Sequence, residues 1–284
     1  MPGRRLLLSF AHPDDESFGM GGSIARYVAE GVEVYLICAT NGDVGTVAPE
    51  MLNGYASVAD LRLAELECAA NILGFKRIFK LGYRDSGMMN SETSQDPACL
   101  WQQPRAAVAQ RVTQVIREVR PQVVVTFNRY GGYGHPDHIA IQRATVDAFH
   151  LAGDPNYVTA DLPPYQPQKL YYTAFSTLVL RLLLPLVRLR GDDPRRLGKN
   201  KDIDALAILE NVEPAHARVD ISAYLELADR ASACHASQLG GGLPRLPLAV
   251  RKLIAGHQRF TRVHPAPRYN KIDETDLFAG VLPD

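Results

Sequence analysis

The chain has no excess of either charge and no long hydrophobic run. Its 31 lysines and arginines are balanced by 31 aspartates and glutamates, so no basic surface for nucleic acid is expected. The most apolar segment, 178–189, contains Arg181, Pro185 and Arg188 and is too short to span a bilayer. We expect a packed or surface amphipathic helix there, with contact to a membrane surface as the alternative.

Cysteine is also scarce. The four cysteines, Cys38, Cys68, Cys99 and Cys234, form no Cys-x-x-Cys pair, which argues against a zinc ribbon and against a disulfide framework. Free buried thiols in a reducing cytoplasm are therefore expected. The apolar stretch after the basic N-terminus reaches His12 within about ten residues, too soon for a secretory signal. We therefore expect a cytoplasmic protein.

The first half of the chain alternates strand-like and helix-like patterns. Strands are expected at 5–11, 33–39, 77–81 and 122–127, and helices at 22–30, 60–73, 105–119 and 137–151. Parallel strands joined in this way need crossover connections, which place helices on both faces of the sheet. The pattern predicts an α/β, Rossmann-like fold with a mostly parallel sheet.

The second half is less regular. We expect loops at 154–168 and 191–202, a strand at 170–175, a helix at 222–238 and a basic helical stretch at 245–259. No repeat or linker is visible, so the sequence predicts a single domain over 1–284. Within it, 1–153 would form the core with the metal site, and 154–284 a C-terminal elaboration that sets substrate specificity.

Two clusters of histidine and aspartate follow the two most apolar expected strands. Residues 10–22 read FAHPDDESFGMGG after the leucines at 6–8, and residues 134–141 read GHPDHIAI after the valines at 123–125. An α/β protein presents its ligand-binding loops at the carboxyl ends of parallel strands. The two clusters can therefore converge on one divalent metal ion.

The residue types in these clusters suit a catalytic metal. His12 and Asp15 in the first cluster, and His135 and His138 with Asp137 in the second, supply imidazole nitrogen and carboxylate oxygen. Two histidines and one carboxylate leave an open coordination position for water, which is typical of catalytic zinc sites. Zinc is therefore the expected cofactor. Iron(II) or another divalent metal is the alternative, because it could use the same ligands.

Asp14 is a spare carboxylate beside the expected metal and is suited to be a general base toward water. The histidine not used as a ligand could stabilise or protonate a tetrahedral intermediate. These residues indicate a metal-dependent hydrolase. Two other classes of function stay open, an iron(II) oxygenase and a metal- or sugar-binding protein without catalysis. The strand–helix alternation speaks against the first, and the spare base at Asp14 against the second.

These residues resemble the LmbE-like, or PIG-L, family of zinc-dependent deacetylases. The family's two metal motifs, AHPDDE and HPDH, stand at 11–16 and 135–138. Further matches are RLAEL at 62–66, LGYRDSGM at 81–88 and HASQ at 235–238. The resemblance implies removal of an acetyl group from a small N-acetylglucosamine-type conjugate. The run at 84–88 is similar to the mycothiol branch, where an amidase acting on thiol-linked amino-sugar conjugates is the alternative.

The resemblance also implies a role for individual residues. The metal ligands would be His12, Asp15 and His138. Among the catalytic residues, Asp14 would be the base, His135 would stabilise the oxyanion, Asp137 would orient His135, and Tyr133 would be a mobile tyrosine. Arg62 and Asp85 would bind the sugar. His235 is expected to face the site from its helix and contact substrate. An ordinary ion pair between Arg62 and Asp85 is the alternative for those two. Oligomers are possible, and no macromolecular partner is implied.

Overall fold

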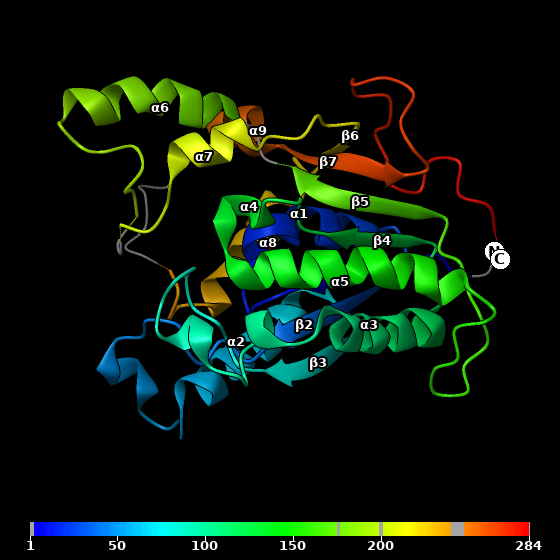
Figure 1. The fold of residues 1–284 in the computed structure, drawn as a ribbon. Coiled ribbons are helices and arrows are strands. Elements are labelled where there is room, and N and C mark those ends of the chain that lie inside the picture. Colours follow the sequence, from blue (N-terminus) through cyan, green and yellow to red (C-terminus); the bar gives the residue numbers. More distant parts are fainter. Residues whose placement is uncertain (1–2, 175–176, 199–200, 240–246, 284) are drawn as a thin grey trace.

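The described strands form one seven-stranded sheet in a computed structural model, which describes all residues except 1–2, 175–176, 199–200, 240–246 and 284 (Figure 1). The strands are β1 (Arg5–Phe10), β2 (Glu33–Thr40), β3 (Arg77–Tyr83), β4 (Val123–Thr126), β5 (Lys169–Ala174), β6 (Ala217–Asp220) and β7 (His257–His264). Their order is β3-β2-β1-β4-β5-β7-β6. The first five are parallel, and β7 runs antiparallel to both β5 and β6. The prediction of a mostly parallel sheet is confirmed.

Helices cover both faces of this sheet (Figure 1). They are α1 (Asp15–Ala29), α2 (Val58–Leu73), α3 (Arg105–Val119), α4 (Gly131–Gly134), α5 (Pro136–Gly153), α6 (Thr177–Leu189), α7 (Ala205–Glu210), α8 (Leu225–Cys234) and α9 (Leu248–Ala255). On one face α1, α2 and α8 pack together, and on the other α3 packs against α5. The expected α/β layering is confirmed.

The two central strands position the site. The leucines of β1 and the valines of β4 are completely buried, and the two strands pair in parallel with Leu7 opposite Val124. The chain leaves β1 toward β2 on one side, whereas β4 and β5 lie on the other, so the strand order reverses between β1 and β4. Loops at such a switch point form the ligand crevice of open α/β sheets. Both histidine clusters follow these two strands.

The first helix begins earlier than the sequence suggested. We expected it over 22–30, but α1 starts at Asp15. Glycines at 19, 21 and 22 weaken the helical pattern because glycine has a low helix propensity. Packing explains two of them: a Cβ at Gly22 would lie 2.5 Å from the Ile221 side chain, and one at Gly21 would lie 3.3 Å from the Cβ of Ala228. These glycines let α1 pack closely against the C-terminal elements.

The C-terminal half contains elements that the sequence pattern missed. The strand expected at 170–175 is confirmed as β5, but β6, β7 and α7 were not expected. The helix expected over 222–238 is shorter, because α8 ends at Cys234. The basic stretch at 245–259 divides: 245–246 lie outside the described residues, α9 ends before Gly256, and β7 then adds antiparallel to the sheet.

The expectation of four free thiols was wrong for two of them. Cys68 in α2 and Cys234 at the end of α8 form a disulfide with Cα atoms 5.8 Å apart. The two residues are 166 positions apart in the chain, so only the packing of α8 on α2 brings them together. Cys38 and Cys99 are free and buried, as expected.

The apolar segment at 178–189 is helical, as expected, within α6. Leu184 is buried, whereas Leu183, Leu186 and Leu189 are exposed to solvent. Among the described residues, no helix has both the length and the apolar character needed to cross a bilayer.

Candidate metal centre and active site

The loop after β1 presents three acidic residues at the start of α1. His12 is 6% exposed, and its backbone N–H donates to Asp15 Oδ2 over 2.6 Å. Asp15 and Glu16 occupy the first turn of α1, where carboxylates are favoured by the helix dipole. Asp14 has a φ of 136°, in a region that residues with a side chain seldom adopt. The local backbone is thus strained at the residue expected to be the base.

The loop after β4 presents the second cluster. His135 is the N-cap of α5 and its Nδ1 accepts the backbone N–H of Asp137 at 3.2 Å, with Pro136 as first helical residue. One turn further, the ring of His138 stacks on Phe127 with centroids 3.9 Å apart. Both histidines therefore have fixed orientations.

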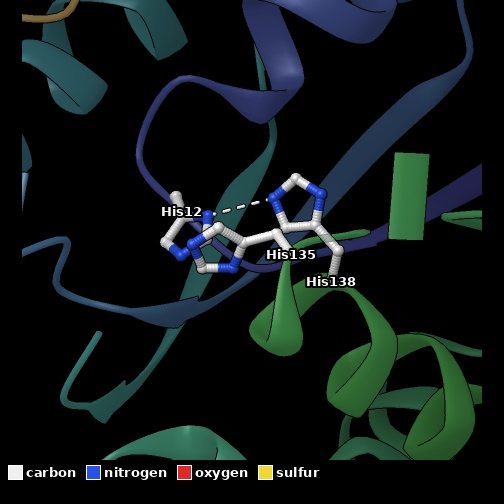
Figure 2. Close-up of side chains that lie close together, drawn as sticks. All are labelled: His12, His135 and His138. Atoms are coloured by element: carbon white, nitrogen blue, oxygen red, sulfur yellow. Dashed lines mark hydrogen bonds between the residues drawn. The ribbon is translucent and has the colours of Figure 1, made fainter. Parts of the chain in front are cut away.

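Side chains from the two loops meet at one point, and Figure 2 shows the three histidines. His12 Nδ1 lies 3.1 Å from His138 Nε2. Asp15 completes the triangle, with Oδ2 3.5 Å from His12 Nδ1 and Oδ1 3.3 Å from His138 Nε2. Atoms bound tetrahedrally to zinc at about 2.0–2.1 Å lie roughly 3.3–3.4 Å from one another. The observed separations therefore fit a single metal ion.

Hydrogen bonds on the far sides of the rings determine which nitrogen atoms face each other. His12 Nε2 lies 3.1 Å from Asp137 Oδ2, and His138 Nδ1 lies 3.1 Å from the carbonyl oxygen of Gly131. Because carboxylate and carbonyl oxygens only accept, these two nitrogens carry the ring hydrogens. If both rings were neutral, lone pairs would face each other across 3.1 Å. Burial lowers the pKa of His12, but the carboxylates of Asp85, Asp137 and Asp15 outweigh it and raise that pKa well above its usual value. A positive charge between the two rings is therefore favoured, and either a metal ion or a proton can supply it.

His135 has the opposite arrangement. One of its ring nitrogens lies within 4.8 Å of ring nitrogens of His12 and His138. His135 also belongs to a second group whose possible ligand atoms lie within 4.8 Å of one another, together with His12, Asp85 and Asp137. However, its Nδ1 accepts a backbone N–H, so Nε2 carries the hydrogen in the neutral ring. His135 is therefore arranged as a hydrogen-bond donor. Together these residues form a buried His/Asp site that could bind a metal ion.

Asp137 contacts a different histidine from the one expected. Its carboxylate is fully buried, accepts the backbone N–H and the hydroxyl of Ser86, and holds His12 Nε2. Only its backbone N–H bonds to His135. The carboxylate therefore orients His12, whereas the sequence led us to expect that it would orient His135. A carboxylate behind a metal-binding histidine fixes its tautomer and raises its basicity.

We expect Asp137→Ala to weaken metal binding by about 10–100-fold, because His12 would lose its orienting partner. Asp137→Asn is the matched control, since an amide oxygen can still accept from His12 Nε2, and its loss should be smaller. Competition with a chelator measures both. Equal affinity in the alanine variant and the wild type would show that this carboxylate does not support a ligand.

Arg62 joins the base to the sugar-binding candidate Asp85. Its guanidinium is buried, donates to Asp14 Oδ2 over 2.9 Å and to the carbonyl oxygens of Pro13 and Gly42, and lies 3.8 Å from Asp85 Oδ2. Asp85 in turn accepts the backbone N–H of Gly87 over 2.8 Å. The two expected residues are thus close together beside Asp14.

The environment of Asp14 suits proton transfer. Burial raises the pKa of its carboxyl group to about 7, with Arg62 acting in the opposite direction and Asp15 adding to the rise. A carboxyl group whose pKa lies near neutrality can both accept and return a proton at ordinary pH, as general acid–base catalysis requires.

A cavity of about 610 Å³ opens over these residues. Its walls include His12, Asp14, Arg62, Asp85, Tyr133, His135, Ser237 and Gln238, and Asp202 and Ile203 from the segment before α7. The half-buried Tyr133 ring lies 5.2 Å from that of His138 and 5.9 Å from that of His135, between ring centroids. The cavity can hold a ligand of drug size.

His235 is placed differently from the expectation. It is completely buried, its Nε2 lies 2.7 Å from Glu16 Oε1, and it is not among the described residues that line the cavity. Sequence reasoning also gave no role to Ser86 or Glu16. Each stands inside a matched motif, but their partners, Asp137 and His235, are distant in the chain, and no local pattern reveals such pairs.

Comparisons with known proteins give one family. The model of the PIG-L family, described as GlcNAc-PI de-N-acetylase, matches residues 7–149. A relative from Thermobifida fusca (strain YX), a 1D-myo-inositol 2-acetamido-2-deoxy-alpha-D-glucopyranoside deacetylase, is 40% identical over 98% of this chain and 100% of its own.

Solved structures share the fold. N,N'-diacetylchitobiose deacetylase from Pyrococcus horikoshii superposes with a TM-score of 0.64 at 20% identity, covering 94% of this chain and 88% of that one. GalB, the 4-carboxy-2-hydroxymuconate hydratase from Pseudomonas putida KT2440, gives 0.59 at 16% identity, covering 94% and 98%. A deacetylase and a hydratase thus share this architecture, so the fold alone does not specify the reaction.

Proposed function

Because the chain belongs to the PIG-L family, we propose that it removes the acetyl group from an N-acetylglucosamine unit linked to inositol. The products are acetate and a free amine. That the chain is an enzyme hydrolysing the amide of an N-acetyl amino sugar follows from the family and from a relative named for that reaction. The inositol aglycone is the finer part of the proposal and is supported by the 40% identity over 98% of this chain and 100% of the relative.

The observation that carries the proposal is the convergence of His12, Asp15 and His138 beside a spare carboxylate. We assign these three as the metal ligands, and zinc as the metal, because their nitrogen and oxygen atoms have tetrahedral spacing. A divalent metal held here would supply Lewis acidity and lower the pKa of a coordinated water. Metal analysis of the purified protein distinguishes zinc from iron(II).

The chain's own residues supply the proton transfers. Asp14, half-buried beside the ligands, accepts a proton from the attacking water and returns it to the leaving nitrogen. His135 donates through Nε2 to the carbonyl oxygen as negative charge develops on it. Tyr133 lies in the cavity wall next to His135 and His138, and we assign its hydroxyl as a second hydrogen-bond donor to the same oxygen.

An amine-release assay tests the function. The purified protein with zinc is offered N-acetylglucosamine, its inositol glycoside, N,N'-diacetylchitobiose and a thiol-linked amino-sugar conjugate. We expect the inositol glycoside to react with the highest kcat/KM. Cleavage of the thiol-linked conjugate alone would make the protein the amidase considered above, and no amine from any acetylated sugar would refute the deacetylase function.

We further propose that Arg62 and Asp85 hold the sugar hydroxyls, because both line the cavity and charged forks bind hydroxyls well in partly buried sites. Asp85→Asn should lower kcat/KM by about tenfold or more, mostly through KM. Arg62→Ala should lower both kcat/KM and the melting temperature, since that guanidinium also holds the loop of Asp14 through buried hydrogen bonds.

The comparison of the two variants separates substrate binding from an ion pair with a purely structural role. Steady-state kinetics and thermal unfolding are measured on the same preparations, with Arg62→Lys retaining the charge. If Asp85→Asn lowers the melting temperature but leaves kcat/KM intact, Asp85 only supports the loop and does not bind the sugar.

A further inference from the structure

Glu16 is a fully buried carboxylate whose oxygens are all engaged by neighbouring groups. Its Oε2 accepts the backbone N–H of Asp14 over 3.0 Å. Its Oε1 accepts the Ser17 hydroxyl over 2.6 Å and lies 2.7 Å from His235 Nε2. Neither Glu16 nor His235 is among the described residues that line the cavity. A buried carboxylate costs free energy unless it is well paired, which explains these contacts. Because Glu16 does not line the cavity, its role must be something other than substrate contact.

The group that Glu16 holds is the strained backbone of Asp14. With φ at 136°, this residue has a strained conformation that persists only where the surroundings enforce it. Its carbonyl oxygen already accepts the N–H groups of Ser17 and Phe18 at the start of α1. Its N–H is fixed by Glu16, so the peptide groups on both sides of the Asp14 Cα are held. The direction of the Asp14 carboxylate depends on this backbone.

Glu16 is in turn fixed from the C-terminal half. His235 follows directly after α8, which packs against α1 and α2. Two further contacts hold this end of α8: the disulfide between Cys68 and Cys234, and Glu65, whose carboxylate accepts the N–H and hydroxyl of Ser237 over 2.8 and 2.6 Å. The position of the His235 ring is therefore determined by α2 and not by substrate.

We propose that Glu16 and His235 are positioning residues that hold the main chain of Asp14 and thereby direct its carboxylate toward the attacking water. The proposal rests on the function assigned to Asp14 above. It gives His235 a role in the chemical step although this residue does not line the cavity. It predicts that damage to this pair lowers kcat, whereas KM and metal content change little.

The test compares Glu16→Ala, His235→Ala and Glu274→Ala. The first two should lower kcat by about 10–100-fold, because a displacement of about 1 Å can cost that much. KM should stay within about threefold, since neither residue touches substrate. Glu274→Ala is the matched control, because it removes a largely buried carboxylate that pairs with Lys169 and Arg262 and contacts neither Glu16 nor Asp14. Its kcat should fall by less than about threefold.

Two further variants make the result decisive. Glu16→Gln keeps an oxygen for the Asp14 N–H and an amide that can pair with His235, so it should recover most of the lost kcat and would replace Glu16→Ala if that variant does not fold. Adding Glu16→Ala to Asp14→Asn should lower kcat no further than Asp14→Asn alone, because the pair acts only through Asp14.

The outcomes separate this proposal from the function on which it rests. Full activity of Asp14→Asn would refute the role of Asp14 itself. Loss of turnover in Asp14→Asn, with normal kcat in both His235→Ala and Glu16→Ala, would refute the positioning role alone. Equal kcat losses in Glu274→Ala and His235→Ala, or additive losses in the double variant, would show a general effect on stability and overturn the proposal.

Discussion

Replacing Asp14 by asparagine should remove most of the turnover while the metal stays bound. Asparagine is nearly isosteric, and its amide oxygen can still accept the hydrogen bond from Arg62 that Asp14 Oδ2 accepts. It cannot take up the proton of the attacking water, and loss of a general base typically costs about 10²–10⁴-fold in rate. Measurement of kcat on the inositol glycoside, together with metal content, checks this expectation.

The matched control is Asp161→Asn, at an exposed loop position that also has a positive φ. It makes the same chemical change far from any catalytic group and should retain wild-type kcat. If Asp14→Asn with full metal content turns over as fast as this control, another group must accept the proton.

Replacing His138 by alanine should lower the affinity for the metal by at least about tenfold. The substitution removes one of the three ligand atoms whose separations fit a single ion. It also removes the ring stacked on Phe127, so some loss of stability should accompany it. Metal analysis after dialysis, and titration of the apoprotein, measure the change.

His150→Ala is the appropriate control, because His150 stands on the same helix, α5, with its side chain exposed. This variant should bind metal like the wild type. Unchanged occupancy in His138→Ala would refute the ligand assignment and would favour the neighbouring group that contains His135 and Asp85.

The sequence predicted the centre of the fold because the signal there is local. Apolar runs as continuous as those of β1 and β4 indicate strands buried on both faces, and the switch point then places the residues that follow them together. His12 and His138 could be paired in this way although they are 126 positions apart. The start of α1 was missed because its glycines serve contacts with α8 and Ile221, which lie far away in the sequence.

What the sequence could not reveal depends on contacts between distant segments. The Asp137 carboxylate could have oriented either histidine, and only its 3.1 Å contact with His12 Nε2 in the folded chain shows that it supports His12. His235 was expected to face the substrate. A helical pattern in the sequence could not show that its side chain meets a buried carboxylate instead. Its partner Glu16 is 219 positions away.

The disulfide between Cys68 and Cys234 makes the chain a closed covalent ring from α2 to the end of α8. The exposed turn at 190–193, between α6 and α7, lies inside this ring. Cleavage of one peptide bond there would open the ring but would not release a fragment. The piece carrying HASQ would stay attached to the piece carrying both metal motifs until a reductant separated them, so the nicked protein would migrate as one species on a non-reducing gel and as two after reduction.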